Sequence, residues 1–237
     1  MVCFKIKIIT RWGYNNMIYV LDAISTGKIQ DLPYSTKRQM RSALNKEKII
    51  GHMWLSKIGF AEDEQEYKDH GGPDKAVCLY SKHNYDLWRD DVNKLPDYAM
   101  FGENLTAQHL DERDVHFGDQ FQLGEAILEV SEIREPCWKI QEKYKIPDLV
   151  KRMSRTCKTG FYFRVVQEGN VPADAHLKLL TRADNETKLS VFELNDLYYN
   201  DNKNIERLQY ALKNPYLTTT RISKLERFLN RANKTQK

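Results

Sequence analysis

Residues 118–130 read GDQFQLGEAILEV, a run with the pattern of two strands joined by a tight turn. Apolar side chains alternate with others over residues 126–130, which is the period of a half-buried strand. Glycine-containing pairs on either side of residues 120–123 predict turns, so the two runs together predict a β-hairpin. Further strand patterns occur at residues 18–24, 77–80 and 161–166. Many short strands with glycine turns favour a mostly antiparallel β-barrel core over a doubly wound sheet.

The region after residue 181 has a helical pattern instead. Residues 190–193, Ser-Val-Phe-Glu, form a capping box and predict the start of a helix. A second helix is predicted over residues 205–212, because Asn214-Pro215 ends it. The third predicted helix places four apolar residues on one face: Ile222, Leu225, Phe228 and Leu229.

Length and composition agree with this organisation. The chain has 237 residues, of which 41% are hydrophobic and 30% charged, as in a folded protein with its own core. This length allows one large domain plus a small unit. We expect an N-terminal extension over residues 1–17, a β-barrel domain over 18–181 and a three-helix domain over 182–237. The predicted fold class is therefore mainly β, followed by a small all-α bundle.

Net charge, apolar run length and cysteine content indicate in which environment the protein is expected. The net charge is +4, but residues 202–237 alone contain nine basic and two acidic residues. The longest apolar runs, such as residues 17–21, are far shorter than the about 20 residues of a membrane helix. We therefore expect no membrane segment. Four cysteines without a C-x-x-C pair or a preceding secretory signal indicate free thiols in a reducing cytoplasm.

The segment Ser131–Lys139 carries the clearest chemical signal. Pro136 removes a backbone donor and ends the strand, so we expect Cys137 on the loop beyond it. Seven Lys and Arg residues and two acids lie between Cys137 and Lys158, and Arg134 precedes them. This positive field favours a thiolate, which can be a nucleophile, a redox group or a soft-metal ligand. A buried free cysteine followed by a solvated basic helix explains the same local sequence.

Two glycine-containing loops are further candidates. Residues 70–76 read HGGPDKA, and successive amides in such a turn, together with Lys75, suit an anionic ligand. A tight turn before the next strand is the alternative. Residues 101–106 read FGENLT, where Glu103 and Asn104 suit the edges of a heterocycle or simply cap the loop.

Several common site motifs are missing from the sequence. The six histidines form no H-E-x-x-H motif and no Cys/His quartet for structural zinc. The dinucleotide, P-loop and G-x-S-x-G motifs are absent as well. Nucleotide-loop and serine-hydrolase functions therefore lose support.

The order of these motifs resembles the MOSC domain family, named after the C-terminal domain of molybdenum cofactor sulfurase. The matching stretches are residues 24–28 (ISTGK), 63–65 (DEQ), 70–76 (HGGPDKA), 101–106 (FGENLT), 114–115 (DV), 118–119 (GD), 128–131 (LEVS) and 134–137 (REPC). The nearest branch is the YiiM-like one, in which a MOSC β-barrel precedes a three-helix domain. The resemblance covers roughly residues 18–229 and is specific, because separate motifs keep their order.

This resemblance implies a bent β-barrel and a molybdopterin-type molybdenum cofactor, whose metal the family's cysteine ligates. Here that position is Cys137. It also implies reduction of N-hydroxylated compounds, including hydroxylaminopurine bases, with oxygen leaving as water. A thiolate suits a transition metal and cationic side chains suit a pterin phosphate. The cofactor would carry the redox chemistry while the protein positions it.

The site residues follow from the matching motifs. His70 and Lys75 would line the anionic side of the pocket, and Asn104 would contact the pterin or position substrate. Arg134 would hold charge beside the sulfur of Cys137, the expected metal ligand. The predicted catalytic residues are Cys137, Arg134 and His70. The predicted cofactor-binding residues are Cys137, Arg134, Lys75, Asn104 and Lys28.

Four positions depart from the family pattern. Glu62, His109 and Cys157 stand where the family has glycine, and Ile133 stands where it has proline. Glu62 adds charge and a Cβ atom to a turn that suits neither. We expect Cys157 to be a packed thiol rather than a second redox group.

The expected partners are an N-hydroxylated small molecule and an electron-donor reductase protein, and a homodimer is left open. A cofactor or sulfur carrier that catalyses no reduction is the alternative function. The basic tail also suggests nucleic acid, since Arg221, Lys224, Arg227 and Arg231 recur near helical spacing. Nucleic acid is the less expected partner, because nothing specifies groove-reading residues. The same face suits an acidic electron-donor protein.

Overall fold

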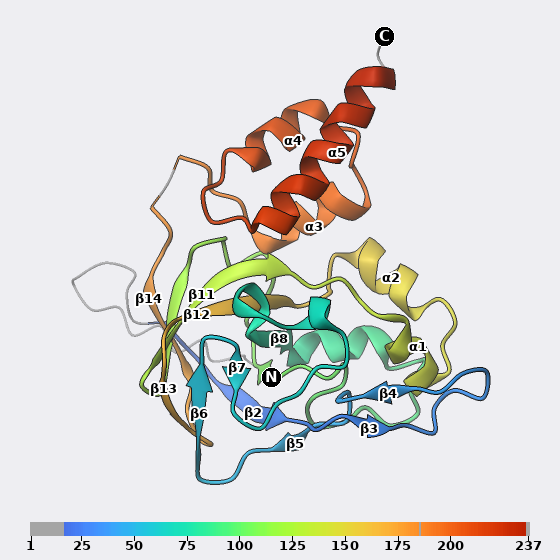
Figure 1. Ribbon diagram of the computed structural model, residues 1–237, viewed down its shortest axis with the longest axis vertical. Coiled ribbons are helices and arrows are strands. Elements are labelled where there is room, and N and C mark those ends of the chain that lie inside the picture. The colour runs from blue at the N-terminus through green and yellow to red at the C-terminus, as the bar shows by residue number, and fades with distance from the viewer. Residues whose placement is uncertain (1–16, 185, 236–237) are drawn as a thin grey trace, which may run out of the picture.

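A computed structural model describes residues 17–184 and 186–235, and its largest element is a nine-stranded sheet (Figure 1). In sheet order the strands are β1 (Ile18–Tyr19), β14 (Leu177–Thr181), β10 (Gln120–Leu123), β11 (Ala126–Ile133), β12 (Phe161–Gln167), β8 (Val77–Ser81), β9 (Leu105–Ala107), β2 (Leu21–Thr26) and β5 (Glu47–Lys48). Among the strands of the described residues, only β8 and β9 pair in parallel. The predicted N-terminal extension lies outside the described residues, apart from Met17.

The sheet curves back towards the segment where it begins. β1 pairs with β14, β2 pairs with β9, and Val20 alone separates β1 from β2. Within residues 17–184 and 186–235, however, no ladder joins β1 to the other terminal strand, β5. The predicted β core is thus confirmed as a large curved sheet, whereas the ladders form no closed barrel.

The predicted hairpin is confirmed as β10 and β11, which pair antiparallel with Leu123 opposite Ala126. Its inward-facing side chains are fully buried: Phe121, Leu123, Ala126, Leu128 and Val130. Burying one Leu or Phe side chain contributes about 1.5–3 kcal/mol, so the alternating pattern decides which face of each strand lies in the core. The strands predicted at 77–80 and 161–166 are also confirmed, as β8 and β12.

Smaller elements surround the main sheet. A second sheet contains β13 (Gly169–Pro172), β6 (His52–Ser56) and β7 (Gly59–Phe60), and a third contains β3 (Gln30–Asp31) and β4 (Arg41–Ser42). The 3-10 helices are η1 (Lys68–His70), η2 (Pro73–Lys75) and η3 (Lys82–Trp88), and the α-helices are α1 (Trp138–Tyr144), α2 (Leu149–Thr156), α3 (Val191–Tyr199), α4 (Ile205–Leu212) and α5 (Thr219–Thr235). None of these helices combines the length and apolar character needed to cross a bilayer.

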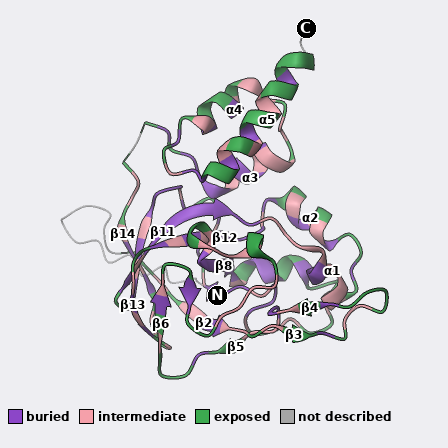
Figure 2. Cartoon of the chain, viewed as in Figure 1, coloured by how far each residue is buried: buried purple, intermediate pink, exposed green. Residues whose placement is uncertain are grey.

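The three predicted C-terminal helices are confirmed as α3, α4 and α5. The capping box begins α3, because Glu193 N donates to Ser190 Oγ and Ser190 N donates to Glu193 Oε2. The buried faces of these helices join the hydrophobic cluster of the sheet through Val191, Leu194, Leu208, Ala211 and Leu225. Figures 1 and 2 show the helices stacked on one end of the sheet with buried residues between them. The fold is therefore mixed α/β, and the domain boundary at residue 181 stays a prediction.

Two departures from the family pattern carry backbone strain. His109 and Cys157 adopt left-handed conformations, with φ of 53° and 59°. This conformation costs a residue with a Cβ atom roughly 1–2 kcal/mol, so glycine would be the unstrained residue at both positions. Cys157 is buried beside Asn200, whose Nδ2 donates to the sulfur at 3.3 Å, and burial raises the pKa of its thiol to about 11.

Candidate functional site

One pocket collects segments that are far apart in the sequence. It lies where β11 continues through residues 134–137 into α1, and its other walls come from residues 42–46, 63–70 and 101–104. Of the predicted site residues, the pocket lining includes Cys137, Arg134, His70, Lys75 and Asn104. Lys28 does not belong to the lining. The structure therefore brings together five of the six predicted residues, while their chemical roles stay predictions.

Cys137 lies at the N-terminus of α1, directly after the strand exit. Its backbone is extended, with φ of −96° and ψ of 147°, and it is the N-cap residue of the helix. The side chain is half-buried, the thiol is free, and the sulfur makes no capping hydrogen bond to the helix. The sulfur is thus held by the backbone at the pocket wall and is not used by the secondary structure itself.

Arg134 offers the pocket a hydrogen-bond donor that the protein does not satisfy. The residue is only 8% exposed, and its Nη2 donates to the carbonyl oxygen of Phe101. Its Nη1 is buried without a partner. Leaving a buried donor unpaired costs about 1–3 kcal/mol, and more for a charged group. An anionic group in the pocket would remove this cost, so the arrangement fits an anionic ligand.

Two lysines add positive charge to the pocket wall. Lys75 Nζ donates to the carbonyl oxygen of Asp69 at 2.7 Å, and Lys139 Nζ donates to that of Arg41. The Lys139 ammonium also lies 4.0 Å from the ring centroid of Tyr67. These contacts fix both charges at the rim without neutralising them, since carbonyl oxygens and ring faces carry no net charge.

His70 is held in its neutral form by the same charges. Burial lowers the pKa of its imidazole, and the positive charges of Arg134, Lys75 and Lys139 lower it further, from 6.5 to about 4. At neutral pH the ring therefore carries one donor and one acceptor nitrogen. It can hydrogen-bond a polar ligand without adding to the charge of the pocket.

We expect an NMR titration of the cofactor-free chain to give His70 an apparent pKa near 4. Because the folded pKa lies below the ordinary 6.5, the unfolded chain takes up this proton first as the pH falls. The His70 contribution to stability is therefore constant above about pH 6.5 and is lost between about 6.5 and 4. Lys75→Met should raise the midpoint by removing a positive charge. A midpoint near 6.5 in the wild type would contradict this account.

The side-chain amide of Asn104, which was expected to contact a ligand, forms hydrogen bonds within the protein. Its Nδ2 donates to the Ser25 carbonyl oxygen at 3.1 Å and to Asp63 Oδ2 at 2.9 Å, and its Oδ1 accepts from Cys78 N at 3.0 Å. The side chain is 4% exposed. Both side-chain hydrogens are used internally, so Asn104 joins three segments at the pocket. Its predicted contact with the pterin or the substrate stays a prediction.

Lys28 lies apart from the other predicted residues. Its side chain is 60% exposed and pairs with Glu64 at 3.5 Å. Glu64 does line the pocket, and a hydrogen bond from the Ile29 amide lowers its pKa. Lys28 therefore reaches the site only through its acidic partner, and an exposed pair of this kind is weak.

The loop at residues 101–106 is a capped loop, which was one of its two interpretations. Glu103 is fully buried and accepts hydrogen bonds from the Tyr85 hydroxyl and the Phe101 amide. The Thr106 hydroxyl donates to the same carboxylate. The Glu103 carboxylate therefore binds groups of its own loop and of η3, and the residue does not belong to the pocket lining.

Several pocket residues with charged or reactive side chains were not site candidates in the sequence analysis, among them Lys46, Cys78, Lys139 and Tyr162. Lys139 stands two residues after Cys137, so its position was a usable signal. Lys46 lies outside every motif and forms a buried ion pair with Asp63. Cys78 and Tyr162 lie on the strands β8 and β12. Nothing in the sequence distinguishes them from the core residues of these strands.

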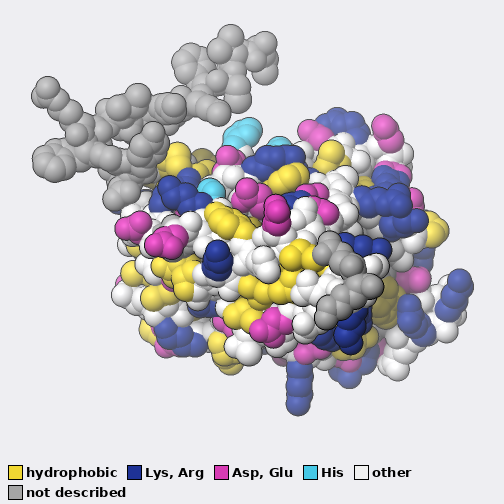
Figure 3. Space-filling view, turned by 90° about the horizontal axis from the view of Figure 1, so that it is seen from above, with side chains coloured by type: hydrophobic (Ala, Val, Ile, Leu, Met, Phe, Trp, Pro, Cys, Tyr) yellow, Lys and Arg dark blue, Asp and Glu magenta, His cyan; other side chains and the backbone are white. Residues whose placement is uncertain are grey.

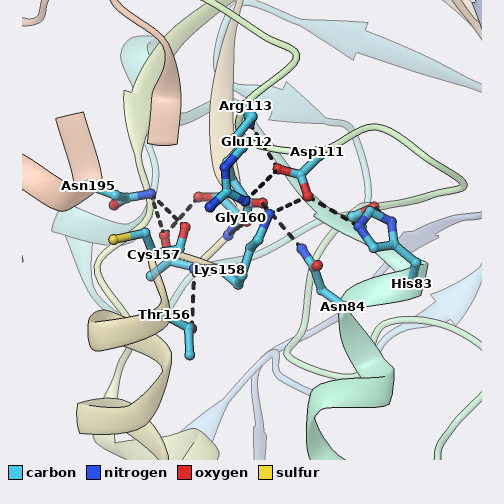
Figure 4. A network of polar contacts seen from close by, with 12 residues as sticks. His83, Asn84, Asp111, Glu112, Arg113, Thr156, Cys157, Lys158, Gly160 and Asn195 are labelled. Atoms are coloured by element: carbon cyan, nitrogen blue, oxygen red, sulfur yellow. Dashed lines mark hydrogen bonds and ion pairs between the residues drawn. The ribbon is translucent and has the colours of Figure 1, made fainter. Parts of the chain in front are cut away.

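A second polar cluster, shown in Figure 4, lies close in the structure to the segment that follows β11 and begins with Arg134. Lys158 pairs with both Asp111 and Glu112, and Glu112 Oε1 accepts from Gly160 N at 3.0 Å. The Gly160 carbonyl oxygen in turn accepts from Arg134 N at 3.3 Å. The cluster is thus linked to the Arg134 backbone through Gly160, in the turn after α2.

The donor set of the pocket fits an anionic cofactor that brings most of its own metal ligands. Among the described residues, no three His, Cys, Asp or Glu side chains gather in a way that could hold a metal ion. One free cysteine sulfur is a soft donor suited to a transition metal. Arg134 lines the same pocket, and its unpaired Nη1 is a charged donor suited to an anion.

Comparisons with known proteins agree with these observations. The MOSC domain family model matches residues 66–178. The chain is 37% identical over 201 residues to the uncharacterized protein YflK of Bacillus subtilis strain 168, covering 84% of this chain and 90% of YflK. It is 38% identical over 178 residues to protein YiiM of Escherichia coli strain K12, covering 72% of this chain and 76% of YiiM.

A solved structure and a longer relative extend the comparison. The crystal structure of YiiM from Geobacillus stearothermophilus superposes with a TM-score of 0.74 at 29% identity, covering 89% of this chain and 99% of that one. A protein named reductase from Gibberella moniliformis strain M3125 / FGSC 7600 is 34% identical over 148 residues. That match covers 61% of this chain but only 26% of the fungal protein.

Proposed function

Because the chain belongs to the MOSC domain family and is homologous to YiiM and YflK, we propose that its pocket binds a molybdenum cofactor and reduces N-hydroxylated compounds. MOSC domains are associated with this cofactor, and a relative is named a reductase. One observation carries the proposal: the same pocket is lined by Cys137, whose thiol is free, and by Arg134, whose Nη1 has no hydrogen-bond partner.

In this proposal each pocket residue has a defined task. Cys137 provides the protein's sulfur ligand to the metal, and Arg134 donates from Nη1 to an anionic oxygen of the cofactor. Lys75 and Lys139 hold positive charge at the rim, where it attracts that anion. The neutral His70 ring orients the polar N–OH group of the substrate by a hydrogen bond. The bound cofactor would supply the two-electron redox couple of the reaction.

The overall reaction defines what the chain requires from partners. Reduction of an N–OH group consumes two electrons and two protons, breaks the N–O bond and releases water. Each turnover would leave the cofactor oxidised by two electrons, so an electron-donor protein that reduces it again is part of the proposal. We also place the protein in the cytoplasm, since the described cysteines Cys78, Cys137 and Cys157 are free.

The curved sheet would correspond to the bent barrel of the family. The chain itself would close this barrel at Val20, which joins β1 to β2.

An anaerobic assay tests the proposed function. Protein expressed in a host that makes the cofactor, and shown to contain molybdenum, is mixed with a chemical reductant and a hydroxylaminopurine. We expect conversion to the aminopurine. Fully metallated protein that gives no conversion would contradict the reductase function. If the same protein carried a transferable persulfide, the result would favour a cofactor or sulfur carrier instead.

A further inference from the structure

The C-terminal helices reach back to the loop that carries Cys137. Arg221 lies in the first turn of α5, and only 1% of its side chain is exposed. Its Nε donates to Glu132 Oε1 at 2.9 Å and its Nη2 donates to Glu135 Oε1 at 2.8 Å. Glu132 is the next-to-last residue of β11 and is buried, and Glu135 stands two residues before Cys137. One guanidinium therefore joins the strand end to the loop.

Three more side chains from the helical region hold the same two carboxylates. The Thr218 hydroxyl donates to Glu132 Oε2 at 2.7 Å. The Lys224 ammonium pairs with Glu135 Oε1, and the Tyr198 hydroxyl donates to Glu135 Oε2 at 3.2 Å. Two acids thus face two cations in a largely buried contact. Replacing a buried ion pair by apolar side chains is often neutral or even stabilising. Stability alone therefore does not explain these four charged residues, whereas the geometry that they fix does.

The connection from Glu135 to Cys137 is short and stiff. Consecutive Cα atoms are about 3.8 Å apart, so at most about 7 Å separates the two residues. Pro136 between them fixes its own φ and has no amide hydrogen. Both Glu135 and Cys137 line the pocket. A displacement of the Glu135 backbone would therefore also move the Cys137 backbone.

These contacts also change the interpretation of the basic tail. Two of the four cations that suggested a nucleic-acid surface, Arg221 and Lys224, are engaged with Glu132 and Glu135. Figure 3 looks onto the end of the molecule formed by the helices and shows acidic side chains interspersed among the basic ones. The helical region therefore directs part of its charge inward, towards the pocket loop.

We propose that Arg221 is a positioning residue, which with Lys224 clamps Glu135 and so holds Cys137 at the pocket wall. The C-terminal helices are then a working part of the site. The importance of this position for reaction rests on the proposed function, because it takes Cys137 as the metal ligand. The clamp itself is a property of the chain without cofactor and is measured there.

Amide hydrogen exchange in the cofactor-free full chain tests the clamp. Glu135→Ala removes the tether but leaves Arg221 paired with Glu132, so the variant should fold. We expect exchange in residues 134–140 to accelerate at least about tenfold, with the rest of the sheet unchanged. Arg221→Met should accelerate it as well, and Arg221→Lys, which retains the charge, should lie between. Unchanged exchange in folded Glu135→Ala would overturn the proposal.

The matched control is Arg207→Met. Arg207 pairs with Asp196 and Asp201, and within the described part of the chain its side-chain hydrogen bonds and ion pairs stay inside the helical region. Its loss should leave exchange in residues 134–140 as in the wild type. Equal acceleration by Arg207→Met would mean that general loosening of the helices, and not the clamp, moves the loop.

Kinetics of the metallated protein separate positioning from mere stability. Glu135→Ala should lower kcat about tenfold or more and change KM by less than about twofold, because a small misplacement of a reacting group affects the chemical step. Arg207→Met should change neither constant. An unchanged kcat for Glu135→Ala would overturn the positioning role. If the metallated wild type has no activity, the proposed function fails while the exchange result still decides the clamp.

Discussion

Replacing Cys137 by serine should reduce the molybdenum retained by the purified protein by at least about 100-fold. Losing a residue that only supports a metal ligand commonly costs 10–100-fold in metal affinity, and Cys137 is here the ligand itself. The fold should persist, because the side chain is half-buried and makes no capping hydrogen bond. The measurement is elemental analysis of both proteins from a host that makes the cofactor, with the melting temperature recorded alongside.

Cys157→Ser is the matched control for this prediction. Cys157 is also a free cysteine, but it is buried at the end of α2 and does not line the pocket. Its variant should retain molybdenum at the wild-type level. Equal molybdenum contents in Cys137→Ser and the wild type would move the metal to another ligand.

Asp63→Ala should cause a large loss of stability. The Asp63 and Lys46 side chains are 3% and 6% exposed and form an ion pair. Asp63 also accepts from Gly27 N at 2.8 Å and from Asn104 Nδ2 at 2.9 Å. Removing one partner of a buried pair costs about 3–5 kcal/mol, because the other charge stays buried. At about 2–4 °C per kcal/mol for a chain of this size, the melting temperature should fall by about 6–20 °C.

An exposed ion pair provides the comparison for this variant. Asp86 is 63% exposed and pairs with Arg89 one helical turn away. Asp86→Ala should cost no more than about 1 kcal/mol, since solvent screens such pairs. Replacing both Lys46 and Asp63 by apolar residues should recover much of the lost stability. If Asp63→Ala lowered the melting temperature no more than Asp86→Ala does, the buried pair would not support the pocket.

Local patterns predicted the elements that depend on local physics. The strand period over residues 126–130 and the capping box at Ser190 both determine backbone structure within a few residues, and both are found in the structure. β11 ends at Ile133, three residues before Pro136, and Cys137 lies beyond the strand exit as predicted. The motifs follow the order of the family that the sequence resembles. This order predicted that His70 and Arg134 belong to one site.

Long-range contacts explain what the sequence could not predict. Asn104 has the composition of a ligand-binding residue, but its partners Ser25 and Asp63 come from segments 79 and 41 residues away. Arg221 falls on the helical spacing of a solvated basic face, yet it is buried because Glu132, 89 residues earlier, accepts its hydrogen bond. Side-chain roles of this kind follow only from which distant segments meet.

The curvature of the sheet is a similar case. Nothing local in residues 18–26 indicates that Val20 interrupts the strand, with β1 turning to β14 and β2 to β9. The left-handed backbone at His109 and Cys157 was equally hidden, since both residue types suggest ordinary conformations. Only the glycines that the family has at these two positions pointed to it.

Selenium in place of the Cys137 sulfur gives the most direct test of molybdenum binding by this residue. The protein is produced with selenocysteine at position 137 and with molybdenum bound, and selenium X-ray absorption reports the atoms next to selenium. We predict a molybdenum neighbour at bonding distance, and none when selenocysteine stands at position 157 instead. A selenium atom at position 137 with only carbon neighbours, in protein that contains molybdenum, would contradict the account.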